Sequence, residues 1–246
     1  MMPTRSDRIA SFLRCFAIQG SWNYRTLLAG GLATAMLPLL RRVYAGDPAR
    51  LRIALERHLR PFNGHPYLCP MAVTALARLE YDEESAETIA RFRSALRAPL
   101  GAVGDELVWA TWRPFCLLLA ILLFALDGRP WVAVTFFLLL FNVGHVSLRA
   151  WAFQRGWNDG LAVGQALRNP PWGRAVGWLT QANLALLGAG VALVAWMVDP
   201  VTVGHPEIAL ALAASLLLGY ARPALGERVA AGLVLAAPAL LILLAA

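Results

Sequence analysis

The chain of 246 residues concentrates its side chains with the clearest chemical potential in one stretch, residues 99–114. On a helix, Asp105, Trp109 and Trp112 of this stretch share one narrow face, because residues four and seven apart lie one above the other. A carboxylate accepts hydrogen bonds from hydroxyl groups, and an aromatic ring packs on the C–H face of a sugar. The spacing therefore favours a carbohydrate site. The alternative is that one of the two adjacent carboxylates pairs with Arg113, while the tryptophans form a belt at the membrane–water interface.

A second polar feature is a turn sequence in which Gly64 separates Asn63 from His65, with Pro66 following. Glycine and proline fix such a turn, and its two polar side chains can both form hydrogen bonds. They either contribute to a binding site or belong to a simple connection between two helices.

Polar residues also interrupt an apolar segment further along the chain, at Asn142 and His145. Polar groups at membrane depth are costly unless they face protein or water. These two side chains therefore line a transport path or form hydrogen bonds between helices.

Other kinds of site lack support in the sequence. The four histidines and three cysteines have no metal-ligand or redox spacing, and His58 lies on an apolar helix face, where we expect it to be packed. Gly101 and Gly104 follow no strand and precede no Lys-Ser/Thr pair, so they form no phosphate loop. No nucleophile stands beside a base. We therefore predict no catalytic residues, no metal site and no cofactor.

The composition is that of an integral membrane protein. Hydrophobic residues make up 59% of the chain and charged residues 15%, against about a quarter charged in soluble domains. The net charge is +7, and all 22 basic residues are arginine. They form no basic stripe that would suit nucleic acid. The first thirteen residues are charged and lack a long apolar core, so we expect no cleavable signal peptide and a cytoplasmic N-terminus.

The N-terminal half, residues 1–98, predicts helices at the membrane surface. Ile9, Leu13 and Phe16 fall on one face of an amphipathic helix suited to the inner leaflet. Residues 27–40 are uncharged but too few for a span of about 20 residues, which predicts a re-entrant or interfacial segment. Asp47 and Pro48 then mark the start of a further helix that must stop by Pro61.

The C-terminal half, residues 99–246, predicts the transmembrane helices, at residues 115–126, 131–148, 176–198, 208–221 and 229–246. Arginines cluster in the loops before the third and last of these segments, and the loop at residues 199–207 has none. The positive-inside rule places the arginine-rich loops in the cytoplasm and the C-terminus outside. We thus predict an all-α integral membrane protein, with amphipathic and re-entrant helices in its N-terminal half and several transmembrane helices in its C-terminal half, forming one domain over residues 1–246.

Four blocks of sequence together resemble the IID component of mannose-type permeases of the phosphotransferase system. The block Gln-x-Ser-Trp-Asn-Tyr is matched by Gln19, Ser21, Trp22, Asn23 and Tyr24. A Leu-Leu-Pro-type stretch with a basic-aromatic end is matched by Leu37, Pro38, Arg41 and Tyr44. The block His-Leu-x-x-Phe-Asn-x-His-Pro is matched by His58, Leu59, Phe62, Asn63, His65 and Pro66. The most specific block is matched by Pro99, Leu100, Gly104, Asp105, Trp109, Thr111, Arg113 and Pro114.

The later Leu-Phe-Asn motif of that family recurs here at residues 140–142, and the resemblance extends roughly over residues 9–200. The chain departs from the family pattern in three places: the Ala-Gly pair is inverted as Gly101-Ala102, the Trp-Gly-Thr-Leu step reads Trp109-Ala-Thr-Trp112, and Arg25 stands where the family usually has glutamate.

The resemblance implies a multi-pass protein of the bacterial inner membrane that forms a sugar pathway with a IIC membrane subunit, in an oligomeric complex. Phosphate would pass through IIA and IIB carriers to a mannose-like hexose, and the IID chain itself would carry no phosphorylated residue and bind no nucleic acid. The implied substrate-binding residues are Asn63, His65, Asp105, Trp109 and Thr111. The departures motivate an alternative, a non-transporting membrane scaffold or sensor that docks IIA and IIB proteins.

Overall fold

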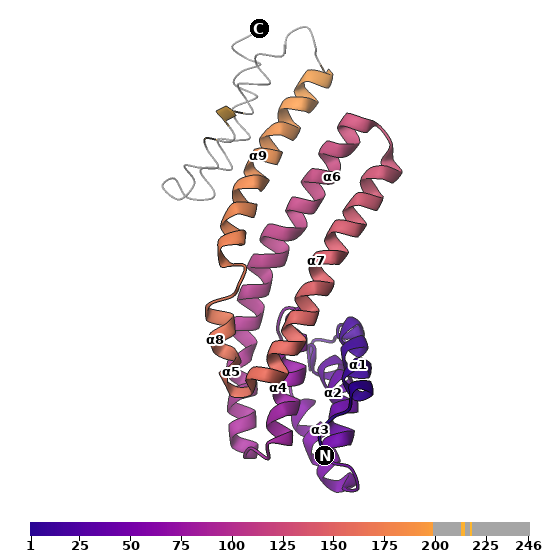
Figure 1. The fold of residues 1–246 in the computed structure, drawn as a ribbon, viewed down its shortest axis with the longest axis vertical. Coiled ribbons are helices and arrows are strands. Elements are labelled where there is room, and N and C mark those ends of the chain that lie inside the picture. Colours follow the sequence, from indigo (N-terminus) through magenta and orange to yellow (C-terminus); the bar gives the residue numbers. More distant parts are fainter. Residues whose placement is uncertain (199–212, 215–216, 218–246) are drawn as a thin grey trace. The chain divides into compact units, whose positions relative to one another are not determined.

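A computed structural model describes residues 1–198 together with residues 213, 214 and 217 (Figure 1). Apart from two isolated β-bridges, which join Leu27 to Asn23 and to Phe62, the regular elements of this part are helices. In chain order they are α1 (Arg5–Arg14), η1 (Cys15–Ala17), α2 (Ala29–Val43), α3 (Pro48–His58), α4 (Cys69–Tyr81), α5 (Ala86–Gly104), η2 (Asp105–Trp112), α6 (Arg113–Asp127), α7 (Pro130–Asp159), η3 (Gly160–Ala162), α8 (Val163–Arg168) and α9 (Gly173–Val198). The predicted all-α class is confirmed for these residues.

The chain forms two compact units. The first consists of Met1–Glu106 and Gly144–Pro170, and the second of Leu107–Val143 and the described residues after Pro170. The first unit is thus discontinuous in sequence. The boundary after residue 98 and the single domain over the whole chain stay predictions.

Local capping interactions explain where the helices of the first unit begin. The hydroxyl of Thr4 accepts a hydrogen bond from the Asp7 backbone N–H, and the Asp7 carboxylate accepts one from the Thr4 N–H, which is a capping box. The predicted start of α3 is confirmed, because the Asp47 carboxylate accepts a hydrogen bond from the Arg50 N–H at 2.9 Å and Pro48 occupies the first turn. Each such cap stabilises its helix by about 1 kcal/mol.

The core of the first unit forms around α2, which packs against α1, α3 and α4. Large apolar side chains of α2 and α4 fill it and are shielded from solvent completely: Leu32, Met36, Leu39, Leu40, Met71 and Leu76. Each contributes about 1.5–3 kcal/mol through burial. The segment predicted as re-entrant is therefore the central helix of this unit.

The lower part of α7, residues 144–159, packs against the same core. The Thr74 hydroxyl on α4 donates a hydrogen bond to the carbonyl oxygen of Phe153 at 2.8 Å. Gly156 permits this approach, because a Cβ atom there would lie 2.2 Å from the Met71 carbonyl oxygen. This contact ties residues separated by about 80 positions in the sequence into one unit.

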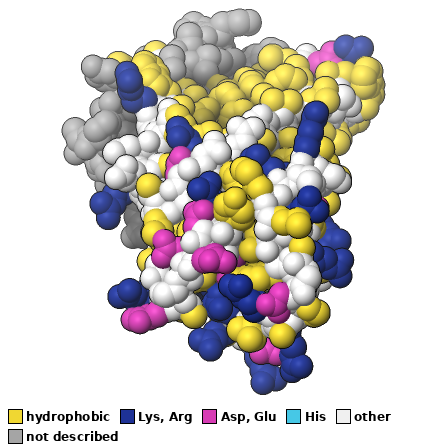
Figure 2. All heavy atoms as spheres, turned by 60° about the horizontal axis from the view of Figure 1, so that its bottom comes forward, with side chains coloured by type: hydrophobic (Ala, Val, Ile, Leu, Met, Phe, Trp, Pro, Cys, Tyr) yellow, Lys and Arg dark blue, Asp and Glu magenta, His cyan; other side chains and the backbone are white. Residues whose placement is uncertain are grey.

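Charged side chains are spread over the face shown in Figure 2, where arginines and acidic residues alternate with small apolar patches. On α3, Arg52 pairs with Glu56 at 2.9 Å, and Arg50 lies 3.9 Å from Glu83. Exposed pairs of this kind stabilise a fold by less than about 1 kcal/mol. Such pairs are well solvated, and they suit the surface of α3 to water rather than to lipid.

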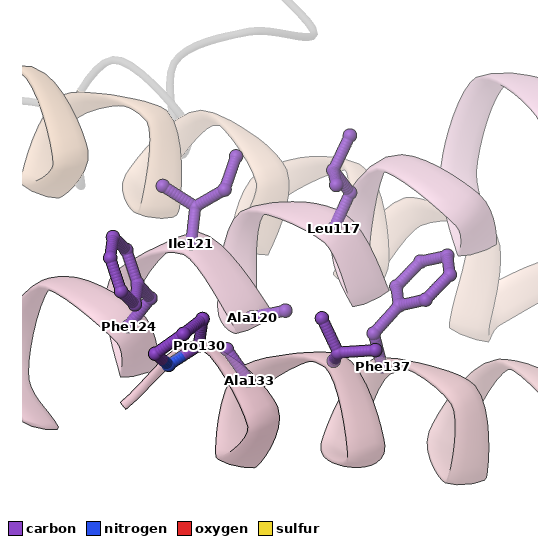
Figure 3. A pocket seen from close by; sticks show the side chains of 8 residues that line it. Leu117, Ala120, Ile121, Phe124, Pro130, Ala133 and Phe137 are labelled. Atoms are coloured by element: carbon purple, nitrogen blue, oxygen red, sulfur yellow. The ribbon is translucent and has the colours of Figure 1, made fainter. Parts of the chain in front are cut away.

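The second unit consists of apolar helices. Helix α6 packs along α9, and the predicted apolar segments 115–126 and 176–198 lie within these two helices. Gly128, with a left-handed φ of 73°, ends α6 and turns the chain into α7. A groove of about 300 Å³ between α6 and the start of α7 is lined by apolar side chains, including Leu117, Phe124 and Phe137 (Figure 3).

Two helical stretches, Ala86–Asp127 and Pro130–Arg168, are long and apolar enough to cross a membrane. Little of the apolar part of either stretch is buried within the protein, unlike a core helix of a soluble protein. The predicted segment 131–148 lies in the second stretch. The predicted segments 208–221 and 229–246 fall outside the described residues, except for positions 213, 214 and 217.

Helix α5 runs through the glycine-rich stretch at residues 99–104, with Pro99 inside the helix. Gly104 lies where the His65 side chain comes very close to the α5 backbone. Glycine is required at this position because a side chain would not fit, and it does not interrupt the helix.

Candidate functional site

The Phe62–Pro66 turn, comprising residues 62–66 between α3 and α4, is held from one side by the segment that follows the first sequence block. The Leu28 N–H donates a hydrogen bond to the Phe62 carbonyl oxygen at 2.9 Å, and the Phe62 N–H donates to the Thr26 carbonyl oxygen at 3.3 Å. The Phe62 ring is completely buried. The backbone of the turn is thus paired with the chain that leads into α2.

Asn23 organises that segment. Its Oδ1 accepts hydrogen bonds from the backbone N–H groups of Arg25 and Thr26 at 3.0 and 2.9 Å, and its Nδ2 donates to the Thr26 hydroxyl at 2.8 Å. This is the local turn chemistry for which asparagine is favoured. The neighbouring rings of Trp22 and Tyr24 lie edge to face, and both are exposed.

The end of α5 holds the turn from a second side. The His65 N–H donates a hydrogen bond to the Leu100 carbonyl oxygen at 3.4 Å. A Cβ atom on Gly104 would lie 2.1 Å from the His65 Cβ, so only glycine permits this approach. The contact places the turn directly beside the residue that precedes Asp105.

Arg149, on α7, holds the turn from a third side, and its side chain is almost completely buried. Its Nη1 donates hydrogen bonds to the carbonyl oxygens of Cys15 at 2.6 Å and Pro66 at 3.3 Å. The guanidinium also lies 4.6 Å from the ring centroid of Tyr67 and 4.9 Å from that of Phe16. A buried cation satisfied in this way fixes the position of the turn relative to α1 and α7.

The predicted residues of the first unit differ in exposure. Asn63 and Asp105 are exposed, and the Asp105 carboxylate takes part in no hydrogen bond or ion pair among the residues that the structure describes. His65 is buried, with its Nδ1 accepting a hydrogen bond from the Tyr67 N–H at 3.2 Å. Burial lowers the pKa of His65 to about 4, with help from the nearby Arg149 charge. His65 is therefore neutral at pH 7 and positions the turn, whereas Asn63 and Asp105 present polar groups to the surroundings.

The predicted residues of the second unit lie in and beside an apolar helix. The Arg113 guanidinium covers the half-buried Trp109 ring at 4.8 Å from its centroid. Thr111 is buried, and its carbonyl oxygen accepts a hydrogen bond from the Asn183 Nδ2 on α9 at 3.0 Å. Trp112 stacks on Phe115, and its buried indole N–H finds no acceptor within the described part of the chain.

The segment Asp105–Trp112 is a π-helix rather than the α-helix assumed from the sequence. A π-helical turn holds more residues than an α-helical turn, so the spacing i, i+4, i+7 no longer keeps three side chains on one face. The carboxylate and the two tryptophans therefore do not form the single stripe that α-helical periodicity predicts. π-helical segments are rare, and those that occur are often found at functional sites.

No group of three histidine, cysteine or acidic side chains that could hold a metal ion occurs among the described residues. Cys15, Cys69 and Cys116 are all buried as free thiols. Burial raises the pKa of Cys15 and of Cys69 to about 12, which keeps both thiols protonated and unreactive.

A buried ionic cluster around Glu80 was not predicted from the sequence. The Glu80 carboxylate accepts hydrogen bonds from Tyr44 at 2.5 Å, Arg57 at 2.6 Å and the His58 Nε2 at 2.8 Å. Burial acts to raise the pKa of Glu80, but the donors outweigh it and the pKa is lowered. Burial likewise lowers the pKa of His58, against the opposing effect of Glu80. The cluster therefore pairs a charged carboxylate with a neutral imidazole. Its sequence signal is an acid near the end of a largely apolar helix, α4.

Comparison with known proteins identifies consistent similarities. A model of the PTS system mannose/fructose/sorbose family IID component matches residues 3–202. The sorbose-specific EIID component of Lacticaseibacillus casei is 33% identical over 165 residues, which cover 65% of this chain and 57% of that protein. The mannose-specific EIID component of Escherichia coli K12 is 32% identical, with 65% and 58% covered. The chain thus spans less than two thirds of the length of these relatives.

Two solved structures resemble the fold. One is a cryo-EM structure of the mannose transporter ManYZ in complex with microcin E492, with a TM-score of 0.60 and 27% identity, covering 77% of this chain and 70% of the matched chain. The other, described as a membrane protein, has a TM-score of 0.69 and 27% identity, with 78% and 71% covered.

Proposed function

Because this chain belongs to the mannose/fructose/sorbose family of phosphotransferase-system IID components, we propose that it is a membrane subunit that forms a sugar translocation pathway together with a IIC subunit. In this proposal a mannose-like hexose is phosphorylated by IIA and IIB carriers as it is released inside the cell. The IID chain contributes binding groups and carries no phosphate itself.

The observation that carries the proposal is the convergence of three sequence blocks on the Phe62–Pro66 turn. The segment after Asn23 pairs with the backbone of Phe62, and the Gly104 end of α5 lies against His65. Residues far apart in the sequence are thereby brought to one place in the first unit. Asn63 and Asp105 are among the polar side chains that remain exposed there.

Asp105 is suited to a sugar because a carboxylate accepts hydrogen bonds from two hydroxyl groups at once. Asn63 adds a group that can both donate and accept. Trp109 and Thr111 follow in the π-helix, where an aromatic face can pack on the C–H face of a sugar ring. In this proposal His65 acts through the turn, which it positions against Gly104.

The proposed placement in the membrane follows the apolar segments. The stretches Ala86–Asp127 and Pro130–Arg168 cross the bilayer, α9 and the later apolar segments add further spans, and the N-terminus lies in the cytoplasm. Helix α1 lies on the inner leaflet with its apolar face toward lipid, and α2 forms the re-entrant part.

The decisive experiment is phosphoenolpyruvate-dependent sugar uptake by cells that carry the IIA, IIB and IIC partners and this chain. Asp105→Asn should lower uptake by on the order of tenfold or more at unchanged protein level, because a hydrogen bond to a charged group is worth about 1.5–3 kcal/mol. The matched control is Asp82→Asn, which removes an exposed carboxylate paired only with Arg78 and should leave uptake unchanged.

Two outcomes would contradict parts of the proposal. Uptake that is unaffected by Asp105→Asn would remove Asp105 from the sugar path. An unmodified chain that co-purifies with IIA and IIB but supports no sugar phosphorylation in vesicles would favour the scaffold alternative, which the departures at Ala102 and Trp112 in the central block motivate.

A further inference from the structure

A groove of about 390 Å³ lies in the first unit between α1 and the lower part of α7. Its walls combine basic and apolar side chains from both helices: Arg5, Arg8, Ile9, Phe12, Ala150 and Phe153. The groove is separate from the Phe62–Pro66 turn and has no part in the proposed sugar site. Its size is within the range of small-molecule sites.

The floor of the groove is apolar. Phe12 and Phe153 meet edge to face with ring centroids 5.5 Å apart. Ile9 stands beside them and is 50% exposed, and Leu13 on the same helix is 62% exposed. An exposed apolar surface that continues from a groove onto a helix face is suited to a hydrocarbon chain.

The rim of the groove is cationic. Arg5 and Arg8 form no ion pair within the described part of the chain. Asp7, the acid between them, is held by Thr4, whose N–H and hydroxyl donate to its carboxylate at 2.8 and 2.6 Å. The Arg8 guanidinium rests over the Trp157 ring at 5.7 Å, which holds it beside the groove. Two unpaired guanidinium groups are a binding arrangement for phosphate.

The position of the groove along α7 corresponds to the depth of lipid headgroups. The nineteen residues from Pro130 to Leu148 contain no charged side chain. At 1.5 Å per residue they extend over about 28 Å, close to the hydrocarbon thickness of a bilayer. Ala150 and Phe153 follow within the next two turns of the helix.

We propose that this groove binds an anionic phospholipid, with the phosphate between Arg5 and Arg8 and an acyl chain along Ile9, Phe12 and Phe153. The proposal rests on the membrane location of the chain but not on sugar transport. The lipid would anchor α1 to α7 at the cytoplasmic leaflet, where anionic headgroups attract basic segments.

The test is native mass spectrometry of the full chain in detergent, titrated with phosphatidylglycerol and with phosphatidylcholine of the same acyl composition. The unmodified chain should bind one phosphatidylglycerol on the order of tenfold to thirtyfold more tightly than phosphatidylcholine, since each arginine near a headgroup contributes about fivefold. The double variant Arg5→Gln/Arg8→Gln should bind both lipids equally. Arg50→Gln/Arg52→Gln removes the same charge from α3 and should keep the preference.

A second variant addresses the apolar part of the site. Ala150→Phe fills the groove without changing charge and should abolish the tight phosphatidylglycerol complex, with folding checked by circular dichroism. If the double arginine variant does not fold, Arg5→Gln alone is sufficient, because the Arg5 side chain is exposed.

Three results would overturn the proposal. They are an equal loss of preference in the α3 control, retention of phosphatidylglycerol by Ala150→Phe, and competition by glycerol phosphate as effective as that by the lipid. The last result would mean that the arginines bind a free phosphate.

Discussion

The contact between His65 and Gly104 makes a prediction in which one substitution has opposite effects at two positions of the same helix. Gly101 and Gly104 both lie in α5. A Cβ atom on Gly101 would have nothing within 4 Å, whereas a Cβ atom on Gly104 would lie 2.1 and 2.2 Å from the Cβ and Cγ atoms of His65. The effect of replacing glycine by alanine can therefore be compared between a position with free space for the added methyl group and a position without it.

The expected magnitudes follow from helix propensity and overpacking. Alanine is favoured over glycine within a helix by about 1 kcal/mol, so Gly101→Ala should raise the free energy of unfolding by up to that amount. Gly104→Ala gains the same term, but the His65 Cβ is fixed to its backbone and cannot swing away, so the whole turn must shift. Overpacking of this kind costs about 1–3 kcal/mol, and the clash here belongs at the upper end. We expect the two variants to differ by about 2–3 kcal/mol.

Thermal unfolding in detergent, followed by circular dichroism, measures this difference, and sugar uptake reports on the site. Gly104→Ala should lower the melting temperature and reduce uptake, because the displaced turn carries Asn63. Gly101→Ala should do neither. Equal melting temperatures for the two variants would refute the close packing of the turn against α5.

Two further predictions concern stability. The pKa values of His58 and Glu80 are lowered in the fold and that of His65 falls to about 4, so the contribution of these groups to the free energy of unfolding is complete above pH 6.5 and is lost as the pH falls. The melting temperature should therefore decline below pH 6.5, and His65 should account for a loss of about 3 kcal/mol at most by pH 4. A melting temperature that rises on acidification would contradict this sign. Trp112→Phe removes a buried indole N–H that has no acceptor among the described residues. The substitution should therefore leave the melting temperature unchanged or raise it by the equivalent of about 1 kcal/mol. A marked drop would show that the N–H has a partner in the folded protein.

The sequence predicts the helices well where local chemistry sets their limits. The Asp47 cap and the stop before Pro61 are read directly from residue types, and the apolar run 131–148 lies in a helix as expected. The π-helix at Asp105–Trp112 could not be foreseen, because a carboxylate and tryptophans at these positions fit an α-helix equally well. The residue types of this segment therefore do not indicate the change of helix type.

Part of the candidate site was also accessible from sequence. Asn63 and Asp105 were selected as polar residues beside a turn and an apolar run, and both are exposed. The burial of His65 was not predicted, since it depends on Gly104, about 40 residues later in the chain. Glu80 was missed for a similar reason, because its three partners lie 22 to 36 residues away, directly after α2 and on α3.

The discontinuous first unit has a consequence for the order of events during synthesis. Its residues Met1–Glu106 leave the ribosome before Gly144–Pro170. The hydrogen bonds from Arg149 to Cys15 and from Thr74 to Phe153 form only after the lower part of α7 has been made. Between the two pieces the chain supplies an apolar helical hairpin, α6 and the start of α7. The N-terminal unit is therefore completed only after this hairpin has been synthesised, and until then the α4 surface around Met71 and Thr74 lacks the cover that Phe153 and Gly156 provide.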